Sequence, residues 1–425
     1  MDIVSGLVLI IFICTYAAIS SERVDRTATS LLGMGAVGLV LWVFGTEFIV
    51  IVELIEWHTI LFLIAMMIIV TIAASSGMFQ YLALELARPT KGDTRRLFVT
   101  FLAFVFGMSL FIDTAPTMLV MGPLTIEICR ALEIDFRPFL ISEAITSNFA
   151  SIPTVVGAIP NIVIVDQTHL DSVIQFAALM PLAIILFVVS IPLMLRLFDD
   201  QLGPGEESMI SEMMQIDSRH MIRSRRDFFL SIVAIVILIL GFTIGPAFHL
   251  DTSLLAIVLA SALLISSREW VDDILKRVNW STIFFLLGLF GLVAALSVIG
   301  VIEAIGAGVG ALIGDNESLA TVFMIWVPAI LSGFIDNIPV SAVLAPIALQ
   351  FPAFGAIIPL ALIVAVNIGG FLLPIGAPAN IIALALAQKE NNPISMVSFF
   401  KIGAPLALVM LFIGTAWMLL VGMFL

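Results

Sequence analysis

The sequence predicts an all-α polytopic membrane protein with about ten spans, two re-entrant helical hairpins and two discontinuous helices. Three observations support this fold class: the composition, the separation of basic from acidic loops, and an internal repeat. Of the 425 residues, 61% are hydrophobic and 12% are charged, whereas soluble domains average about 45–50% and about 25%. The mean hydropathy is +1.20. A soluble fold could not bury this much apolar surface, so most of the chain is expected to face lipid.

Apolar runs between charged breaks place the spans in order along the chain. Single helices are expected at 3–20, 27–46, 58–80, 176–195, 228–247, 252–267, 280–302 and 402–424. Two longer runs, 138–165 and 354–387, carry Gly, Pro and Asn in mid-span and are expected to be broken helices. The segments 97–129 and 318–350 are too long for one span and contain an Asp and a Pro in the middle, which predicts a hairpin in each.

All 18 Lys and Arg residues fall on one set of the loops that these spans define, from Arg23 to Lys401. The opposite loops carry acidic residues such as Glu47 and Asp315 and no basic residue. The positive-inside rule therefore predicts that the basic loops are cytoplasmic and the N-terminus is outside. We expect an integral protein of the plasma membrane. The N-terminal segment has no basic n-region, so it is expected to be a span and not a cleaved signal.

An internal repeat relates the two halves of the chain. Glu56–Leu63 aligns with Asn279–Leu286, and Phe111–Pro116 aligns with Phe334–Pro339 at the same offset. After a short slip in the loop that follows, Asn148, Gly157 and Asn161 align with Asn367, Gly376 and Asn380. The sequence thus predicts inverted repeats of five spans and one hairpin each, 1–198 and 227–425, joined by a cytoplasmic linker at 199–226. Such repeats are typical of secondary transporters, whose site lies at the midplane between them.

Each predicted hairpin carries an aspartate at its tip, within the sequences Asp113-Thr114-Ala115-Pro116 and Asp336-Asn337-Ile338-Pro339. A carboxylate at membrane depth costs roughly 2.5–3.5 kcal/mol, so two at equivalent places indicate a function. We expect Asp113, Thr114, Asp336 and Asn337 to bind a cation or a proton. The alternative is that each aspartate only caps the second helix of its hairpin.

The broken spans supply the other expected ligands. A break offers carbonyl groups to a cation at the end of one half-helix and N–H groups to an anion at the start of the next. The residues concerned are Asn148, Thr154 and Asn161 in the first span and Asn367, Gly369, Gly370 and Asn380 in the second. Na⁺ is the one metal ion expected, at Asp113, Asn148, Asp336 and Asn367. Glu143 is either a proton carrier or a hydrated residue near the inner interface.

Other classes of function are disfavoured by the motifs that the sequence lacks. The four histidines stand singly at loops or span ends, so no metal centre is expected beyond Na⁺. The sequence shows no nucleophile with a base and no P-loop, which argues against an enzyme and against an ATP-driven pump. Basic residues this few and scattered do not indicate a nucleic-acid partner. We expect no cofactor other than Na⁺ as a coupling ion.

These motifs resemble one group of the ion transporter superfamily over nearly the whole chain. The resemblance is carried by Glu22-Arg23-Val24-Asp25-Arg26-Thr27, Gly92-Asp93, the two tips, Arg137-Pro138-Phe139-Leu140-Ile141-Ser142-Glu143-Ala144, Ser147-Asn148, Pro160-Asn161-Ile162, Gly369-Gly370 and Ala379-Asn380. The group comprises arsenite permeases, NhaD-type sodium/proton antiporters and the P protein, and is related to divalent anion:sodium symporters. The resemblance implies a scaffold domain that forms a homodimer and an elevator-like transport domain that holds cations at its tips and unwound loops.

The first unwound loop departs from the pattern of this group, S-N-I-G-G-T-A-T-L-I-G-D-P-P-N. In this chain Phe149, Ala150, Ser151, Pro153 and Ala158 differ from it; Ala150 and Ser151 replace the two glycines, and Ala158 replaces the acidic residue. The dicarboxylate relatives carry Ser-Asn-Thr at the tips, where this chain carries an aspartate. An anionic tip suits a proton or Na⁺ better than a bare dicarboxylate.

The first hypothesis for the function is secondary active transport of a small anion, arsenite-like inorganic or small organic, coupled to H⁺ or Na⁺. The alternative is a sodium/proton antiporter that uses the same two aspartates. A dicarboxylate:sodium symporter and a passive channel rank lower. A channel would not need paired hairpins with a carboxylate on each. The expected partners are the transported substrate, the lipid bilayer and a second copy of the chain.

Overall fold

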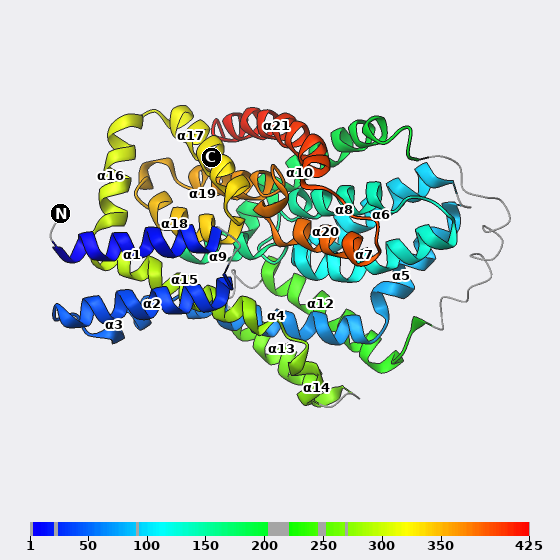
Figure 1. Cartoon of the computed structure of the whole chain (residues 1–425), viewed down its shortest axis with the longest axis horizontal. Coiled ribbons are helices and arrows are strands. Elements are labelled where there is room, and N and C mark those ends of the chain that lie inside the picture. The colour runs from blue at the N-terminus through cyan, green and yellow to red at the C-terminus, as the bar shows by residue number, and fades with distance from the viewer. Residues whose placement is uncertain are drawn as a thin grey trace.

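The computed structural model describes residues 3–20, 24–90, 93–202, 221–244, 252–267 and 271–424, and within these residues it contains helices and no strand. Many of the helices run along the long axis of the molecule (Figure 1). Most of the predicted linker, residues 203–220, lies outside the described residues. The all-helical fold class is confirmed.

The described helices follow one another in two series. The first series is α1 (Ile3–Ser20), α2 (Arg26–Val43), α3 (Phe48–Glu53), α4 (Trp57–Ser75), α5 (Met78–Ala87), α6 (Thr94–Ser109), α7 (Thr114–Ala131), α8 (Arg137–Ala150), α9 (Ile159–Thr168) and α10 (Ser172–Leu197). The second series is α12 (Arg225–Ile244), α13 (Thr252–Ser266), α14 (Val271–Lys276), α15 (Trp280–Val298), α16 (Val301–Ile313), α17 (Glu317–Phe334), α18 (Asn337–Ala348), α19 (Ile357–Gly369), α20 (Pro378–Lys389) and α21 (Met396–Val421).

Every break that the sequence predicts inside a long apolar segment is present. The segment 97–129 divides into α6 and α7, and 318–350 divides into α17 and α18. The broken spans 138–165 and 354–387 divide into α8 with α9 and α19 with α20. The re-entrant path of the hairpins, the domain boundaries and the inverted orientation of the repeats stay predictions.

The prediction of one span at 58–80 is wrong. Helix α4 ends at Ser75 and α5 begins at Met78, because Gly77 adopts a left-handed backbone with φ of +83°. A Cβ at Gly77 would lie 1.8 Å from the carbonyl oxygen of Met221, so the turn also needs the close approach that glycine allows. Gly300, the repeat counterpart of Gly77, has φ of +72° and precedes α16 in the same way. The sequence did not predict α5 and α16, the two helices that begin after these glycines.

Side-chain contacts at helix starts recur at equivalent positions of the two repeats. The indole Nε1 of Trp57 donates to the carbonyl oxygen of Val52 at 3.0 Å, which ties α4 to α3. The Nε1 of Trp280 donates to the carbonyl oxygen of Leu275 at 2.8 Å, which ties α15 to α14. Trp280 and Leu275 are the repeat counterparts of Trp57 and Val52, so the repeat extends from sequence to local geometry.

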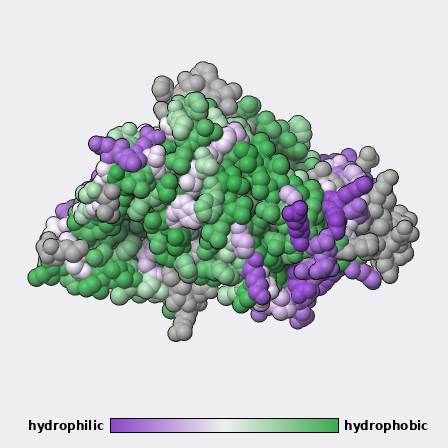
Figure 2. Space-filling view, turned by 90° about the horizontal axis from the view of Figure 1, so that it is seen from above, coloured by the Kyte–Doolittle hydropathy of each residue, from purple (hydrophilic) through white to green (hydrophobic). Residues whose placement is uncertain are grey.

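The outer surface is that of an integral membrane protein. Six helices of the described residues are long and apolar enough to cross a membrane: α2, α4, α10, α15, α17 and α21. Large apolar side chains such as Leu32, Val188 and Phe412 are each at least 60% exposed. Figure 2 shows apolar residues across the middle of one face, with most of the hydrophilic residues gathered toward its right-hand end and a smaller group at the upper left. A membrane would cover such an apolar belt.

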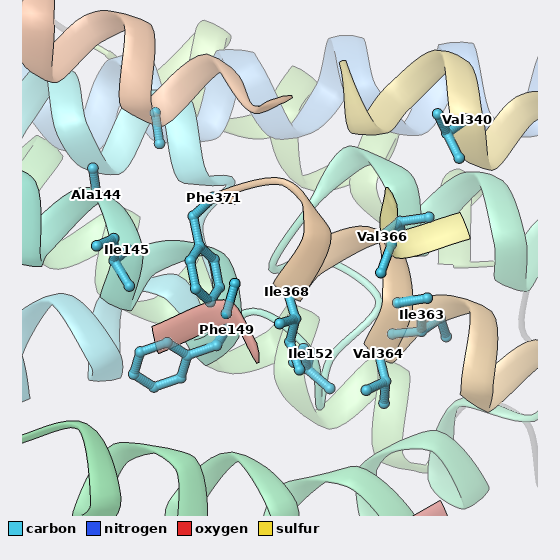
Figure 3. Packing of buried hydrophobic residues seen from close by; sticks show 14 of the residues in the cluster. Ala144, Ile145, Phe149, Ile152, Val340, Ile363, Val364, Val366, Ile368 and Phe371 are labelled. Carbon is cyan, nitrogen blue, oxygen red and sulfur yellow. The ribbon is translucent and has the colours of Figure 1, made fainter. Parts of the chain in front are cut away.

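The first half of each broken helix lies in the interior of the molecule. Every residue of α19 is buried, as is nearly every residue of α8. Phe149 and Ile152 from the first break and Ile368 and Phe371 from the second belong to one apolar cluster (Figure 3). Because Phe149 aligns with Ile368 and Ile152 with Phe371, the two repeats contribute equivalent positions to this core. The packing holds both breaks in fixed places.

Candidate functional site

The two tip aspartates occupy the same local position but have different partners. Asp113 and Asp336 are the N-cap residues of α7 and α18. Asp336 Oδ1 accepts a hydrogen bond from the backbone N–H of Ile338 at 3.0 Å, which is ordinary capping. Asp113 makes no side-chain cap bond to α7, and its Oδ1 accepts instead from the backbone N–H of Ile159, the first residue of α9, at 3.2 Å. The first tip carboxylate is therefore bound to the broken helix beside it.

Both aspartates line one cavity of about 870 Å³. Its charged lining residues are Asp25, Arg26, Asp113, Arg223, Arg277 and Asp336. Ile159 and Pro378, the first residues of α9 and α20, also reach the cavity, so two helix N-termini adjoin it. Helix N-termini and arginines favour an anion, and carboxylates favour a cation. The cavity thus offers binding groups for both.

The four asparagines of the broken spans are fully buried, and two of them bind the unwound backbone. The Asn161 Nδ2 donates to the carbonyl oxygens of Ser151 and Thr154, both at 2.8 Å. The equivalent bonds in the second repeat run from Asn380 Nδ2 to the carbonyl oxygens of Gly370 at 2.8 Å and Leu373 at 3.3 Å. The sequence predicted that carbonyl groups at the breaks would bind a cation. In the structure these carbonyl oxygens accept hydrogen bonds from the asparagine amides.

Hydrogen bonds between the asparagines also join the two repeats. Asn148 Nδ2 donates to Asn380 Oδ1 at 3.2 Å. The reciprocal bond runs from Asn367 Nδ2 to Asn161 Oδ1 at 2.7 Å. The residues of one bond are the repeat counterparts of the residues of the other, so the two breaks meet as an approximately symmetric pair.

One difference between the repeats leaves a buried acceptor without a donor. The Ser151 hydroxyl lies 3.1 Å from Asn367 Oδ1, but the counterpart of Ser151 is Gly370, which has no side chain. Asn148 Oδ1 accordingly has no hydrogen-bond partner among the described residues, and neither has Asn337 Oδ1. The Asn337 amide nitrogen lies 3.3 Å from the position of a Cβ on Gly370. Buried amide oxygens without donors are suitable ligands for a hard cation.

Gly370→Ser tests whether Na⁺ binds at these amide oxygens, and we expect it to weaken that binding. The new hydroxyl would stand where Ser151 stands in the other repeat and would donate to Asn148 Oδ1. We expect the Na⁺ concentration for half-maximal thermal stabilisation of the purified protein to rise about tenfold, which corresponds to about 1.4 kcal/mol of binding free energy. Gly35→Ser is the matched control, because a Cβ at Gly35 meets nothing within 4 Å. An unchanged Na⁺ midpoint in Gly370→Ser would place the ion elsewhere.

Of the predicted site residues only Asp113 and Asp336 line the cavity; the remaining ones do not. Glu143 is fully buried and does not line the cavity; its Oε1 accepts from the Thr125 hydroxyl at 2.6 Å, and its Oε2 has no partner in the described residues. Thr154 donates to the carbonyl oxygen of Leu110 at 2.5 Å and so joins the first break to the first tip. Thr114, the first residue of α7, is buried.

The glycine at the end of α19 has a packing role. A Cβ on Gly369 would lie 2.3 Å from the carbonyl oxygen of Ala329, so glycine allows α19 to approach the α17 backbone.

The sequence prediction missed two residues of the site, Arg26 and Ser151. The sequence predicted a cytoplasmic loop position for Arg26 and no binding role. Ser151 was noted only because it replaces a glycine of the family pattern. The repeat alignment with Gly370 was the signal that could have identified Ser151.

A second acidic cluster lies where α4 begins, away from the cavity. The Thr59 hydroxyl donates to Asp166 Oδ2 at 2.7 Å. Burial, and to a smaller extent the Asp166 carboxylate, raises the pKa of Glu56 to about 7. The folded protein therefore holds a proton on Glu56 between about pH 4.5 and 7 that the unfolded chain releases.

Because the folded state binds the extra proton, thermal stability is expected to fall as the pH rises from about 4.5 through 7. Glu56→Gln keeps a neutral side chain at every pH, so we expect it to reduce this decline and to be more stable than the unmodified protein at pH 8. Midpoint temperatures in detergent at pH 5 and pH 8 measure the effect. Glu53→Gln, an exposed position on α3, is the control. Equal pH dependence in Glu56→Gln and the unmodified protein would contradict the assignment.

Comparisons with known proteins agree with the membrane fold. Residues 16–366 match the CitMHS family, described as citrate transporter. The chain is 31% identical to a 46 kDa membrane protein of Mycobacterium leprae, with 94% of each chain covered. It is 28% identical to the human P protein over 95% of this chain and 58% of that one. The match to the P protein confirms the resemblance inferred from the motifs.

A solved structure with a similar fold is the YdaH transporter of Alcanivorax borkumensis, whose topology is described as unusual. The TM-score is 0.60, the identity is 13%, and the match covers 95% of this chain and 98% of that chain. At this identity the likeness concerns the fold alone.

Proposed function

The chain belongs to the CitMHS citrate transporter family of membrane transporters, and on this premise we propose that it is a secondary active transporter that moves a small anion coupled to H⁺ or Na⁺. The observation that carries the proposal is the shared cavity onto which both tip aspartates open together with three arginines. A membrane-depth carboxylate has a high energetic cost, and binding of a coupling cation would offset it.

Anion binding is supported by the positive groups on the cavity wall. Arg26, Arg223 and Arg277 line it, and α9 and α20 begin there. Guanidinium groups bind carboxylates and other oxyanions with charge-assisted, often bidentate hydrogen bonds. The volume of about 870 Å³ accommodates a small organic anion with its hydration. Given the family description, citrate is the first substrate to test, followed by arsenite.

Cation binding is supported by Asp113 and by the amide oxygens of Asn148 and Asn337. The Asp113 carboxylate accepts a backbone N–H through Oδ1. Asn148 Oδ1 and Asn337 Oδ1 are buried acceptors without donors in the described part of the chain. Glu143, with one carboxylate oxygen unpartnered there, is a candidate proton carrier. We place the coupling ion at the tips and the adjoining breaks.

The orientation of the proposed cycle follows from the loops around the cavity. Its basic residues belong to the loops and helix ends that the positive-inside rule assigns to the cytoplasm. We therefore assign this conformation to the inward-open state in the plasma membrane. The other half of the cycle would carry the tips toward the acidic loops, in a transport domain that slides against a dimeric scaffold.

The second candidate function is sodium/proton antiport. It is favoured by the tip carboxylates, for which Na⁺ and H⁺ would compete. The same cavity and the same aspartates would then move cations in exchange, with no anion.

Purified protein in liposomes separates these functions. The proposal expects uptake of radiolabelled citrate or arsenite that requires an imposed Na⁺ or pH gradient and stops when the gradient is dissipated. Proton movement on addition of Na⁺, with no anion present, would favour antiport and overturn the anion proposal. Uptake that is indifferent to both gradients would indicate a channel. Empty liposomes, and liposomes holding Asp113→Asn, control for leak.

A further inference from the structure

An arginine from α2 binds Asp336, the aspartate of the second hairpin tip. Arg26, the first residue of α2, lies 310 residues before Asp336 in the sequence. Its Nη1 donates to Asp336 Oδ2 at 3.0 Å, and the side chains are 37% and 12% exposed. The guanidinium also lies 5.2 Å from the centroid of the Phe285 ring, a cation–π distance. Two contacts therefore hold this cation on the cavity wall.

The comparison of the two repeats shows that one backbone donor of Asp113 has no equivalent at Asp336. Asp113 receives the backbone N–H of Ile159 at the start of α9. The counterpart of Ile159 at the start of α20 is Pro378. Proline has no N–H, so Asp336 cannot receive the equivalent bond. The Arg26 guanidinium binds Asp336 in place of that donor and brings a full positive charge.

The same end of α18 has a second link to the N-terminal helices. The Tyr16 hydroxyl on α1 donates to the carbonyl oxygen of Pro339 at 3.1 Å. With the Arg26–Asp336 ion pair, this bond fastens the first turn of α18 to α1 and α2. At Asp113 the partner is instead the start of α9. The two tips are equivalent in sequence but differ in what holds them.

We propose that Arg26 is a tethered cation that competes with Na⁺ for Asp336. The inference rests on the proposed function, in which Asp336 binds a coupling cation. A carboxylate that already carries a guanidinium attracts a second cation weakly, so Na⁺ binds at Asp336 only when Arg26 leaves. Departure of Arg26 breaks the ion pair between α2 and α18. Cation binding at Asp336 and loss of this ion pair are thereby one event.

The test is a Na⁺ titration of Arg26→Gln. Purified protein in detergent is titrated with NaCl at fixed pH and at ionic strength held constant with choline chloride, and the midpoint temperature of unfolding is recorded. With the competing charge removed, the half-saturating Na⁺ concentration is expected to fall about tenfold, as for the loss of one close charge pair of about 1.4 kcal/mol. Arg26→Lys keeps the charge and is expected to stay within about threefold of the unmodified protein.

Two controls separate competition from general damage. Arg95→Gln removes another arginine–aspartate pair, with Asp199, at an exposed place away from the cavity, and is expected to leave the Na⁺ midpoint unchanged. Asp336→Asn and the double variant Arg26→Gln/Asp336→Asn are expected to give the same weak Na⁺ response, because Arg26 acts through Asp336.

An unchanged or higher half-saturating Na⁺ concentration in Arg26→Gln overturns the proposal. Tighter Na⁺ binding that persists in the double variant also overturns it, since the effect would then not pass through Asp336. Binding is read from thermal stabilisation and needs no flux. A protein that binds Na⁺ as expected but moves no anion in liposomes would refute the transport proposal and leave the competition at Asp336 standing.

Discussion

Asp113→Asn is expected to lower gradient-driven anion uptake by at least about a hundredfold while the protein still folds and inserts, since a hundredfold loss corresponds to about 2.7 kcal/mol of lost cation binding. Asparagine keeps an oxygen that accepts the Ile159 N–H, so the local fold is preserved. It loses the negative charge that would hold Na⁺ or a proton. The same reasoning applies to Asp336→Asn at the second tip.

Initial rates of labelled uptake into liposomes with matched amounts of protein measure this effect. Asp171→Asn is the control, because Asp171 caps α10 on an exposed loop and does not line the cavity. Size-exclusion profiles establish that each variant is folded. Full gradient-driven uptake by Asp113→Asn would show that the carboxylate has only a structural role at the start of α7.

Asn161→Ala is expected to be the most destabilising of the substitutions considered. Its amide satisfies the carbonyl oxygens of Ser151 and Thr154 and accepts from Asn367 Nδ2; Ser151 and Asn367 are fully buried and Thr154 is half-buried. Each buried partner left unpaired costs about 1–3 kcal/mol, so the free energy of unfolding falls by several kcal/mol. The measurement is the temperature at which half of the protein is lost from the monodisperse size-exclusion peak.

Ser142→Ala is the matched control for Asn161→Ala. Ser142 is also fully buried, in α8, but its hydroxyl has no hydrogen-bond partner in the described residues. Removing it is expected to change the midpoint temperature little. Similar losses in both variants would mean that the bonds to the unwound backbone contribute no more than ordinary packing.

Much of the fold could be predicted because its signals are local and repeated. A proline three residues after an aspartate marks both tips, and glycines and prolines inside apolar runs mark both broken helices. Backbone conformation at these places is determined by the residues themselves. The agreement between two copies removed the ambiguity that a single occurrence would have had. The helical breaks at 110–113 and 151–158 follow directly.

The parts that could not be predicted depend on contacts between distant segments. Nothing near Arg26 in the sequence shows that its guanidinium reaches Asp336. The use of Asn161 to pair backbone carbonyl groups depends on how α9 packs beside the break. The sequence prediction merged α5 with α4 because Gly77 is one glycine in an apolar run, and nothing near it in the sequence shows that it adopts a positive φ with the Met221 backbone close by.

The reciprocal asparagine bonds also constrain how the protein is made. Asn148 binds a residue 232 positions later, and Asn161 binds one 206 positions later. A ribosome releases the first break long before either partner exists. The amide groups at α8 and α9 therefore stay incompletely paired until α19 and α20 have been made. The candidate site is completed as a late step of biogenesis, and truncation before α19 would leave the first half without the partners of Asn148 and Asn161.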